Sequence, residues 1–217
     1  MTSPVRVFSS RSSHSRRVIS ASRRPGAGTG SGQGTGCFGC TFGINQWGTI
    51  AGSYLEANNV FHGFVPSSKG AFTTFEAPGA DTTPGSFNGT SAQSINDWGA
   101  VAGYSVDAKG VAHGYLRSPD GTFTTFDATG AGTSSYQGTG CFSDCPVGLN
   151  DWGVITGSYW DSNNVQQGYL RTPEGSFVTI DPPGSTGTQP ESINDSGAIM
   201  GYYLDANNVY HGFLRAQ

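Results

Sequence analysis

Residues 94–104 read Ser-Ile-Asn-Asp-Trp-Gly-Ala-Val-Ala-Gly-Tyr, and versions of this phrase occur four times along the 217-residue chain. Its key asparagines are Asn45, Asn96, Asn150 and Asn194, which are 51, 54 and 44 residues apart. A period of about 40–50 residues built from short strand-like segments is typical of a β-propeller or a similar array. In such an array no single repeat buries its own apolar face without a neighbour.

Turn-forming residues divide each repeat into four short segments that are rich in aromatic and β-branched residues. In the second repeat these turns are 96–99 (Asn-Asp-Trp-Gly), 109–110 (Lys-Gly) and 118–121 (Ser-Pro-Asp-Gly). Glycine, asparagine and proline supply the backbone angles that tight hairpin turns need. Three hairpins make a four-stranded antiparallel meander, so we expect an all-β propeller of four such blades.

The chain divides into two expected regions. Residues 1–17 form a Ser/Arg-rich segment with little to bury, which predicts a disordered basic tail. Residues 18–217 would form the propeller. Its four repeats occupy about 25–79, 80–130, 131–184 and 185–217. The last repeat stops before its own outer strand, and we expect the segment 18–23 to supply that strand and close the ring, which would remove an open sheet edge.

Composition narrows the setting in which the protein works. The net charge of −4 disfavours a nucleic-acid partner. No apolar run approaches the ~20 residues of a membrane span, so no membrane partner is expected. Four cysteines fit an oxidising compartment, and we expect an extracellular or cell-surface protein, although no signal peptide is visible in this chain.

The pattern Ile-Asn-x-x-Gly-x-x-x-Gly-x-Tyr, followed by His-Gly-Phe and then Phe-Thr-Thr-Phe-Asp-x-Pro-Gly-Ala, resembles the repeat of bacterial extracellular HAF-repeat proteins. The resemblance covers about residues 25–217. It implies a β-propeller-like fold and an exported setting, and it implies no reaction. The third repeat departs from the pattern, because Gln167 stands where histidine is expected.

One end of the strands should carry the second turns and the long crossover loops, and we call it the loop face. Aromatic residues such as Phe87 and Tyr136 should lie there. Two further candidate sets begin or end strands near it; they are the acids Glu56, Asp107, Asp161 and Asp205 and the histidines His62, His113 and His211.

For the acids we favour turn formation, because an aspartate before a turn accepts hydrogen bonds from nearby backbone amides. Ligand contact is the alternative. The histidines should lie opposite Leu55 and Val106 on the neighbouring strand, which favours packing between blades over ligand binding or proton transfer. A ring of histidines could bind a metal, but Gln167 breaks that ring, so we predict no metal site there.

Trp47, Trp98 and Trp152 mark the first turn of three repeats, and Ser196 takes this place in the fourth. We favour a wedge between neighbouring blades. The alternative is a set of exposed rings that stack on sugars.

The cysteines Cys37, Cys40, Cys141 and Cys145 lie in equivalent loops of the first and third repeats. Four cysteines allow three pairings. We favour disulfides, either local or between the two loops, with free thiols and a single zinc held by all four sulfurs as alternatives. No other cofactor is predicted.

A glycosidase needs two carboxylates with unlike pKa values, and near-identical repeats give near-identical environments. We therefore predict no catalytic residue. The leading hypothesis is a non-catalytic recognition module for carbohydrate or another extracellular polymer, with repeated shallow sites. The alternatives are an extracellular glycan hydrolase or lyase acting at the loop face, and a surface scaffold that self-associates through exposed blade edges.

Overall fold

The computed structural model describes residues 26–35, 40, 42–66, 72–141 and 145–216. In this part of the chain the fold is all-β, as expected, and no helix there has the length and apolar character that crossing a bilayer requires. Each repeat forms a run of antiparallel hairpins, because glycine and asparagine adopt the left-handed backbone angles that its tight turns need.

The strands follow the repeats. The first repeat holds β1 (Phe42–Ile44), β2 (Ile50–Leu55), β3 (Phe61–Pro66) and β4 (Phe72–Phe75). The second holds β5 (Gly89–Ile95), β6 (Val101–Val106), β7 (Ala112–Arg117) and β8 (Phe123–Phe126). The third holds β9 (Gly138–Thr139), β10 (Gly148–Leu149), β11 (Ile155–Trp160), β12 (Gln166–Arg171) and β13 (Phe177–Thr179). The fourth holds β14 (Gly187–Ile193), β15 (Ile199–Leu204) and β16 (Tyr210–Arg215).

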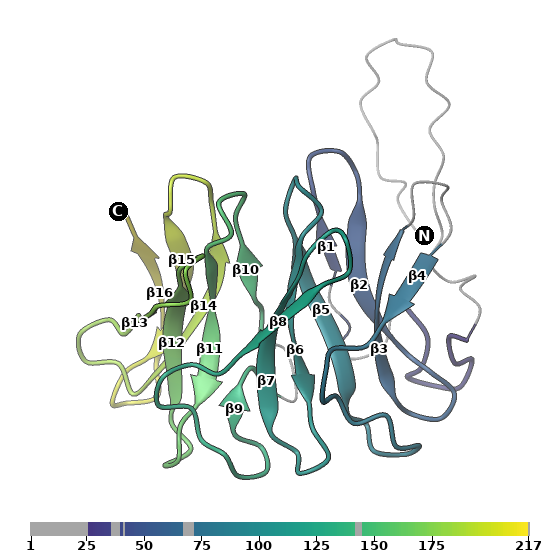
Figure 1. Cartoon of the computed structure of the whole chain (residues 1–217). Coiled ribbons are helices and arrows are strands. Elements are labelled where there is room, and N and C mark those ends of the chain that lie inside the picture. Colours follow the sequence, from purple (N-terminus) through teal and green to yellow (C-terminus); the bar gives the residue numbers. More distant parts are fainter. Residues whose placement is uncertain (1–25, 36–39, 41, 67–71, 142–144, 217) are drawn as a thin grey trace, which may run out of the picture.

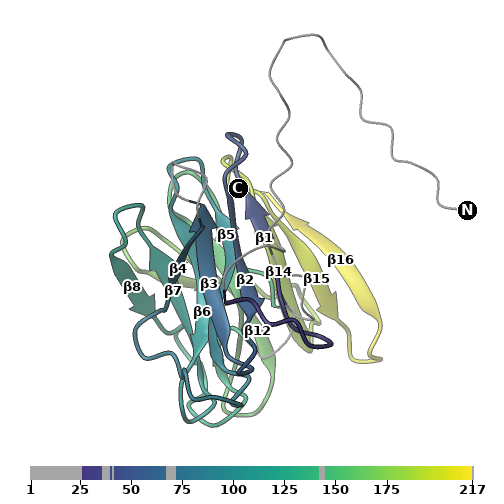
Figure 2. The ribbon, with the colours of Figure 1, turned by 90° about the vertical axis from the view of Figure 1, so that its right-hand side faces the viewer.

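The repeats stand side by side in chain order (Figure 1). The first turns lie at one end of the strands, which we call the first-turn face, and the second turns and crossover loops lie at the other, the loop face. In the view turned by 90°, β8 and β16 lie on opposite sides, with β1, β5 and β14 between them (Figure 2). The inner strands contact one another, since β5 meets both β1 and β10.

The prediction of a closed four-bladed antiparallel propeller is wrong. The first three repeats form one mixed, 13-stranded sheet that runs from β1 to β13, and β14–β16 form a separate three-stranded sheet. No pairing among the described strands joins the first repeat to the last. The proposed closing segment, 18–23, lies outside the described residues, as does the tail 1–17.

Two parallel contacts produce the mixed sheet. Phe61 pairs with Gly89, and Ala112 pairs with Gly138, so the third strand of one repeat pairs in parallel with the first strand of the next. Gly89 has φ +123°, and a Cβ on it would lie 2.1 Å from the carbonyl oxygen of Phe61. Glycine therefore permits a backbone approach that separate blades would not have.

The expected four strands per repeat fail in the third repeat, whereas the fourth repeat ends before an outer strand, as expected. In the third repeat the first strand is split into β9 and β10, with the Cys141–Cys145 loop between them. The fourth repeat has three strands, and β16 is the edge of its sheet within the described residues.

The apolar core lies between repeats rather than within them. One cluster joins Ala51 and Phe75 of the first repeat to Ile95 and Tyr115 of the second. Equivalent clusters join the second repeat to the third and the third to the fourth. The guanidinium of Arg117 adds to the first cluster, because it lies 5.0 Å from the centre of the Phe75 ring. Each repeat therefore depends on its neighbours for stability.

Candidate functional site

The first turn of each repeat is organised by its asparagine. The Oδ1 atom of Asn96 accepts the N–H of Ala100 at 2.9 Å, which closes the turn. Its Nδ2 donates to the carbonyl of Asn150 in the next repeat at 3.3 Å. Asn45 and Asn150 do the same, donating to the carbonyls of Asn96 and Asn194 at 3.1 and 3.2 Å. These bonds form a ladder that fixes each turn against the next, which we call the asparagine ladder.

The acidic residues after the asparagines make a second line of bonds. The backbone N–H of Asp97 donates to Oδ1 of Asp151 at 2.8 Å, and that of Asp151 donates to Oδ1 of Asp195 at 2.9 Å. The N–H of Gln46 donates to Asp97 in the same way at 2.9 Å. The first-turn face is therefore a rigid surface with carboxylates along it.

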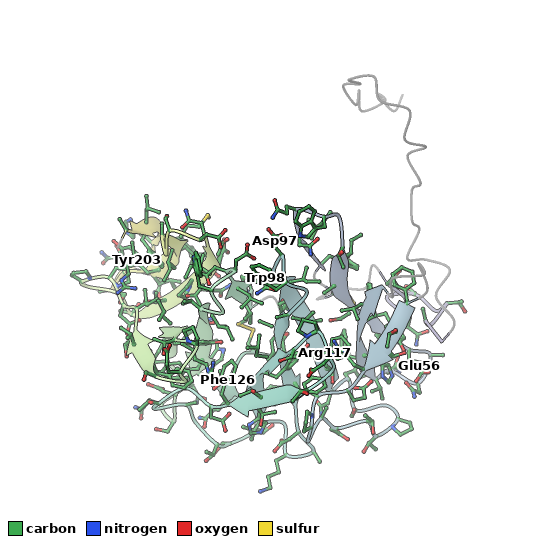
Figure 3. The ribbon with its side chains drawn as sticks, turned by 45° about the horizontal axis from the view of Figure 1, so that its top comes forward. Glu56, Asp97, Trp98, Arg117, Phe126 and Tyr203 are labelled. Atoms are coloured by element: carbon green, nitrogen blue, oxygen red, sulfur yellow. A yellow bond between two sulfur atoms is a disulfide. The ribbon has the colours of Figure 1, made fainter. Side chains whose placement is uncertain are left out.

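The three tryptophans project from this surface. Trp47, Trp98 and Trp152 are 72%, 73% and 70% exposed, so the expected wedge between blades is wrong. The space between turns is occupied by the asparagine ladder instead, and each tryptophan sits at a turn tip before a glycine with positive φ. Figure 3 shows Trp98 beside Asp97 on this face, away from Glu56 at the other ends of the strands.

Hydrogen bonds fix the turns that carry Trp47, Trp98 and Trp152, which we call the tryptophan row. The backbone N–H groups of Trp47 and Trp152 each donate to the asparagine of their own turn at 3.1 Å. The indole Nε1 of Trp152 also donates to the carbonyl of Asp195 at 2.9 Å. In the fourth repeat Ser196 takes the same place, and its hydroxyl donates to Oδ1 of Asn194. The turn thus forms with either residue.

On the loop face, the aspartates shape the second turns. Oδ1 of Asp107 accepts the N–H groups of Lys109 and Val111 at 2.8 and 2.9 Å. Burial raises the pKa of Asp107, but these two donors together with His113 outweigh it and hold that pKa below its ordinary value. Asp161 and Asp205 accept from the equivalent amides, which lower their pKa values. Turn formation is their observed role.

The expected strand partners of the histidines are wrong by one residue. His62 lies opposite Tyr54, and His113 lies opposite Ser105. The cause is the second turn, which is a three-residue loop rather than a two-residue one: the carbonyl of Glu56 accepts the N–H of Asn59, which has φ 62°. A three-residue hairpin of this kind shifts the register by one position.

Two histidines lie between carboxylates. Nδ1 of His62 contacts Glu76, and its Nε2 lies 3.3 Å from Glu56. Burial lowers the pKa of His62, but the hydrogen bonds and charges of Glu76 and Glu56 outweigh it and raise that pKa overall.

The second repeat places His113 in the same arrangement, 2.8 Å from Asp127 and 3.5 Å from Asp107. In the third repeat Gln167 replaces the histidine and donates to Asp161 at 3.4 Å. His211 contacts Asp205 at 3.1 Å. An amide therefore makes the contact in the third repeat that histidine makes in the others. Within the described residues, no group of three or more potential ligands is arranged for a metal ion.

Shallow hollows open between repeats on the loop face. One of them, about 580 Å³, lies among Phe87, Asn88, Lys109 and Tyr136. Phe87 and Tyr136 have φ 56° and 66° and are 57% and 70% exposed. A second hollow of about 330 Å³ also includes Tyr136, and its other lining residues differ from those of the first.

Cys141 and Cys145 form a disulfide, with their Cα atoms 5.6 Å apart. Cys40 is disulfide-bonded as well, and Cys37 lies outside the described residues. No described cysteine is free. The predicted disulfides are thus present at these positions, and the zinc alternative is wrong for them.

Comparison with known proteins gives little further guidance. No protein-family model matches the sequence, and no curated protein matches it either. Among solved structures, the chain is similar to the crystal structure of a triple arginine-to-alanine mutant of AofleA from Arthrobotrys oligospora, with 14% identity and a TM-score of 0.48. The similarity covers 83% of this chain and 55% of that one. A likeness at this level defines neither a shared fold nor a shared function.

Proposed function

We propose that this protein is a non-catalytic, extracellular recognition module that binds a neutral polysaccharide along the tryptophan row of its first-turn face. One observation carries the proposal: Trp47, Trp98 and Trp152 are at least 70% exposed on equivalent turns. Apolar surface exposed to water is unfavourable, and exposed aromatic rings at equivalent positions often mark a binding surface. Indole rings stack well on the apolar faces of sugars.

The asparagine ladder makes this row suited to a polymer. It holds the three turns in fixed positions relative to one another. Binding a ligand to the rings therefore costs little conformational entropy in the protein. A chain of similar sugar units can meet several rings at once, and each added contact acts as a linked, intramolecular one.

Charge selects the kind of polymer. The first turns carry Asp97, Asp151 and Asp195, and the third turns beside them carry Asp120 and Glu174. Polyanionic glycans would be repelled by this surface, whereas hydroxyl groups can donate to carboxylates. A neutral glycan therefore fits best.

The disulfides support the proposed extracellular setting. Disulfide bonds persist in oxidising compartments, and Cys141 is bonded to Cys145. Together with the resemblance to extracellular HAF repeats, this supports an exported protein that acts outside the cell.

Retention on insoluble neutral polysaccharides, followed by a glycan array, tests the proposal. The natural Ser196 supplies the matched variant, because it shows that this turn forms with serine. We expect wild type to be retained and the variant Trp47→Ser/Trp98→Ser/Trp152→Ser to be lost. A loop-face control, Phe87→Ala/Tyr136→Ala, should bind as wild type does. Binding that survives in the triple variant and disappears in the control would reject the tryptophan row.

A further inference from the structure

The first repeat carries an apolar residue that its equivalents bury. Ile44 is 69% exposed, whereas Ile95, Leu149 and Ile193, which occupy the same place before the key asparagine, are 6%, 7% and 7% exposed. Those three belong to the clusters between repeats, where each packs on the preceding repeat. Phe42, on the same strand as Ile44, is 46% exposed. We call this surface the leading face.

The fourth repeat shows the opposite half of the same interface. Met200 is 50% exposed, whereas its equivalents Ala51, Ala102 and Thr156 are fully buried. Leu214, opposite Met200 in the hairpin, is 75% exposed.

The positions equivalent to Leu214 show what this surface normally meets. Val65, Leu116 and Leu170 each pack on the cluster shared with the following repeat. We call the surface formed by Met200 and Leu214 the trailing face.

The asparagine ladder ends on the trailing side too. Asn194 closes its turn as the others do, with Oδ1 accepting the N–H of Ala198 at 2.9 Å. In the other repeats the Nδ2 of this asparagine donates to the carbonyl of the next asparagine. Among the described residues no fifth repeat follows to accept from Asn194. The first asparagine, Asn45, comes directly after the leading face and carries the matching carbonyl.

We propose that the leading face of one copy of this chain docks on the trailing face of a second copy, head to tail. The contact would continue the interface that the molecule already forms three times between its own repeats, with Ile44 placed against Met200 and Leu214. The Nδ2 of Asn194 would donate to the carbonyl of Asn45 in the second copy. Because the two faces differ, the contact is heterologous, and it uses neither the tryptophan row nor the loop-face hollows.

A second copy is the occupant that these surfaces fit. Both faces are apolar, and each is the counterpart of a surface that this same sequence buries elsewhere. Exposed apolar residues at both ends of one array favour association with an equivalent repeat, as they do inside repeat proteins.

The test is the mass of the full chain by sedimentation velocity and light scattering, from micromolar to several hundred micromolar. We expect the wild-type mass to rise with concentration above the 22.6 kDa of one chain. Ile44→Asp removes the leading face and Leu214→Asp removes the trailing face, so each variant alone should stay at one chain. Their equimolar mixture keeps one intact face of each kind and should form a capped pair of two chains.

Val178→Asp is the control, because Val178 is 44% exposed on β13 and belongs to neither face. It should associate as wild type does, and circular dichroism should show all variants folded. A wild type that keeps the mass of one chain at every concentration would overturn the proposal. Association of Ile44→Asp alone at wild-type strength would overturn the head-to-tail arrangement, since two trailing faces would then suffice.

Discussion

The side-chain amide of Asn96 lies 3.3 Å from the backbone carbonyl of Asn150 and donates to it, while its oxygen accepts the N–H of Ala100 within its own turn. One side chain thus closes a turn and joins two repeats. Aspartate would lose the donor and serine would lose the reach, which explains why asparagine stands at all four positions.

Replacing Asn96 with alanine should lower the free energy of unfolding by about 1–3 kcal/mol, because it leaves the partly buried N–H of Ala100 without its acceptor and removes the bond to the Asn150 carbonyl of the next repeat. Urea unfolding followed by tryptophan fluorescence measures this. Asn194→Ala is the matched control: it loses the turn contact but no bond to a following repeat, so its loss should be smaller. Equal losses in the two variants would show that the ladder contributes nothing.

Gly89→Ala should destabilise by about 2–4 kcal/mol, since the new Cβ meets the Phe61 carbonyl at 2.1 Å and the residue has φ +123°. Gly79→Ala serves as control. It also has positive φ, +82°, but its Cβ would have nothing within 4 Å, so only backbone strain of about 1–2 kcal/mol applies. Thermal unfolding of both proteins decides the matter. If Gly89→Ala costs no more than Gly79→Ala, the parallel bridge is not a close contact.

The raised pKa of His62 predicts a pH dependence of stability. The folded protein holds this proton more tightly than the unfolded chain, whose histidine titrates near 6.5. The resulting stabilisation is fully present below that pH and is lost as pH rises through the folded-state pKa.

His62→Gln, which copies the natural Gln167, should therefore flatten the change in unfolding free energy over a pH range that begins below 6.5 and extends above the folded-state pKa. Urea titrations at intervals across this range measure it. Lys109→Gln, whose side chain is exposed and makes no contact with His62, should keep the wild-type slope. An unchanged slope in His62→Gln would assign the pH dependence to other groups.

Much of the local structure could be predicted from the sequence. The turn residues predict the hairpins, and the recurring asparagine marks equivalent turns. The open, mixed sheet could not be predicted, because the parallel contact of Phe61 with Gly89 depends on where a crossover loop returns, and a glycine in the sequence does not reveal which backbone lies next to it.

Only part of the candidate site could be predicted from the sequence. The spacing of the tryptophans marks them as candidates. The exposure of their side chains, however, depends on what fills the space between turns, and Asn96 and Asp97 fill it with hydrogen bonds to the next repeat. The histidine register failed because Asn59 adopts φ 62° and lengthens the turn by one residue. The positions of Phe87 and Tyr136 were anticipated, but their left-handed backbone was not, since bulky residues rarely adopt it.

The measurement that tests the tryptophan row most directly is the affinity of Ser196→Trp for the neutral polysaccharide that wild type binds, from depletion isotherms beside wild type and Trp98→Ser. A fourth ring on the last equivalent turn should tighten binding by about three- to tenfold, and Trp98→Ser should weaken it by a similar factor, each about 0.7–1.4 kcal/mol. Identical affinities for all three proteins would contradict the proposal that this row binds the polymer.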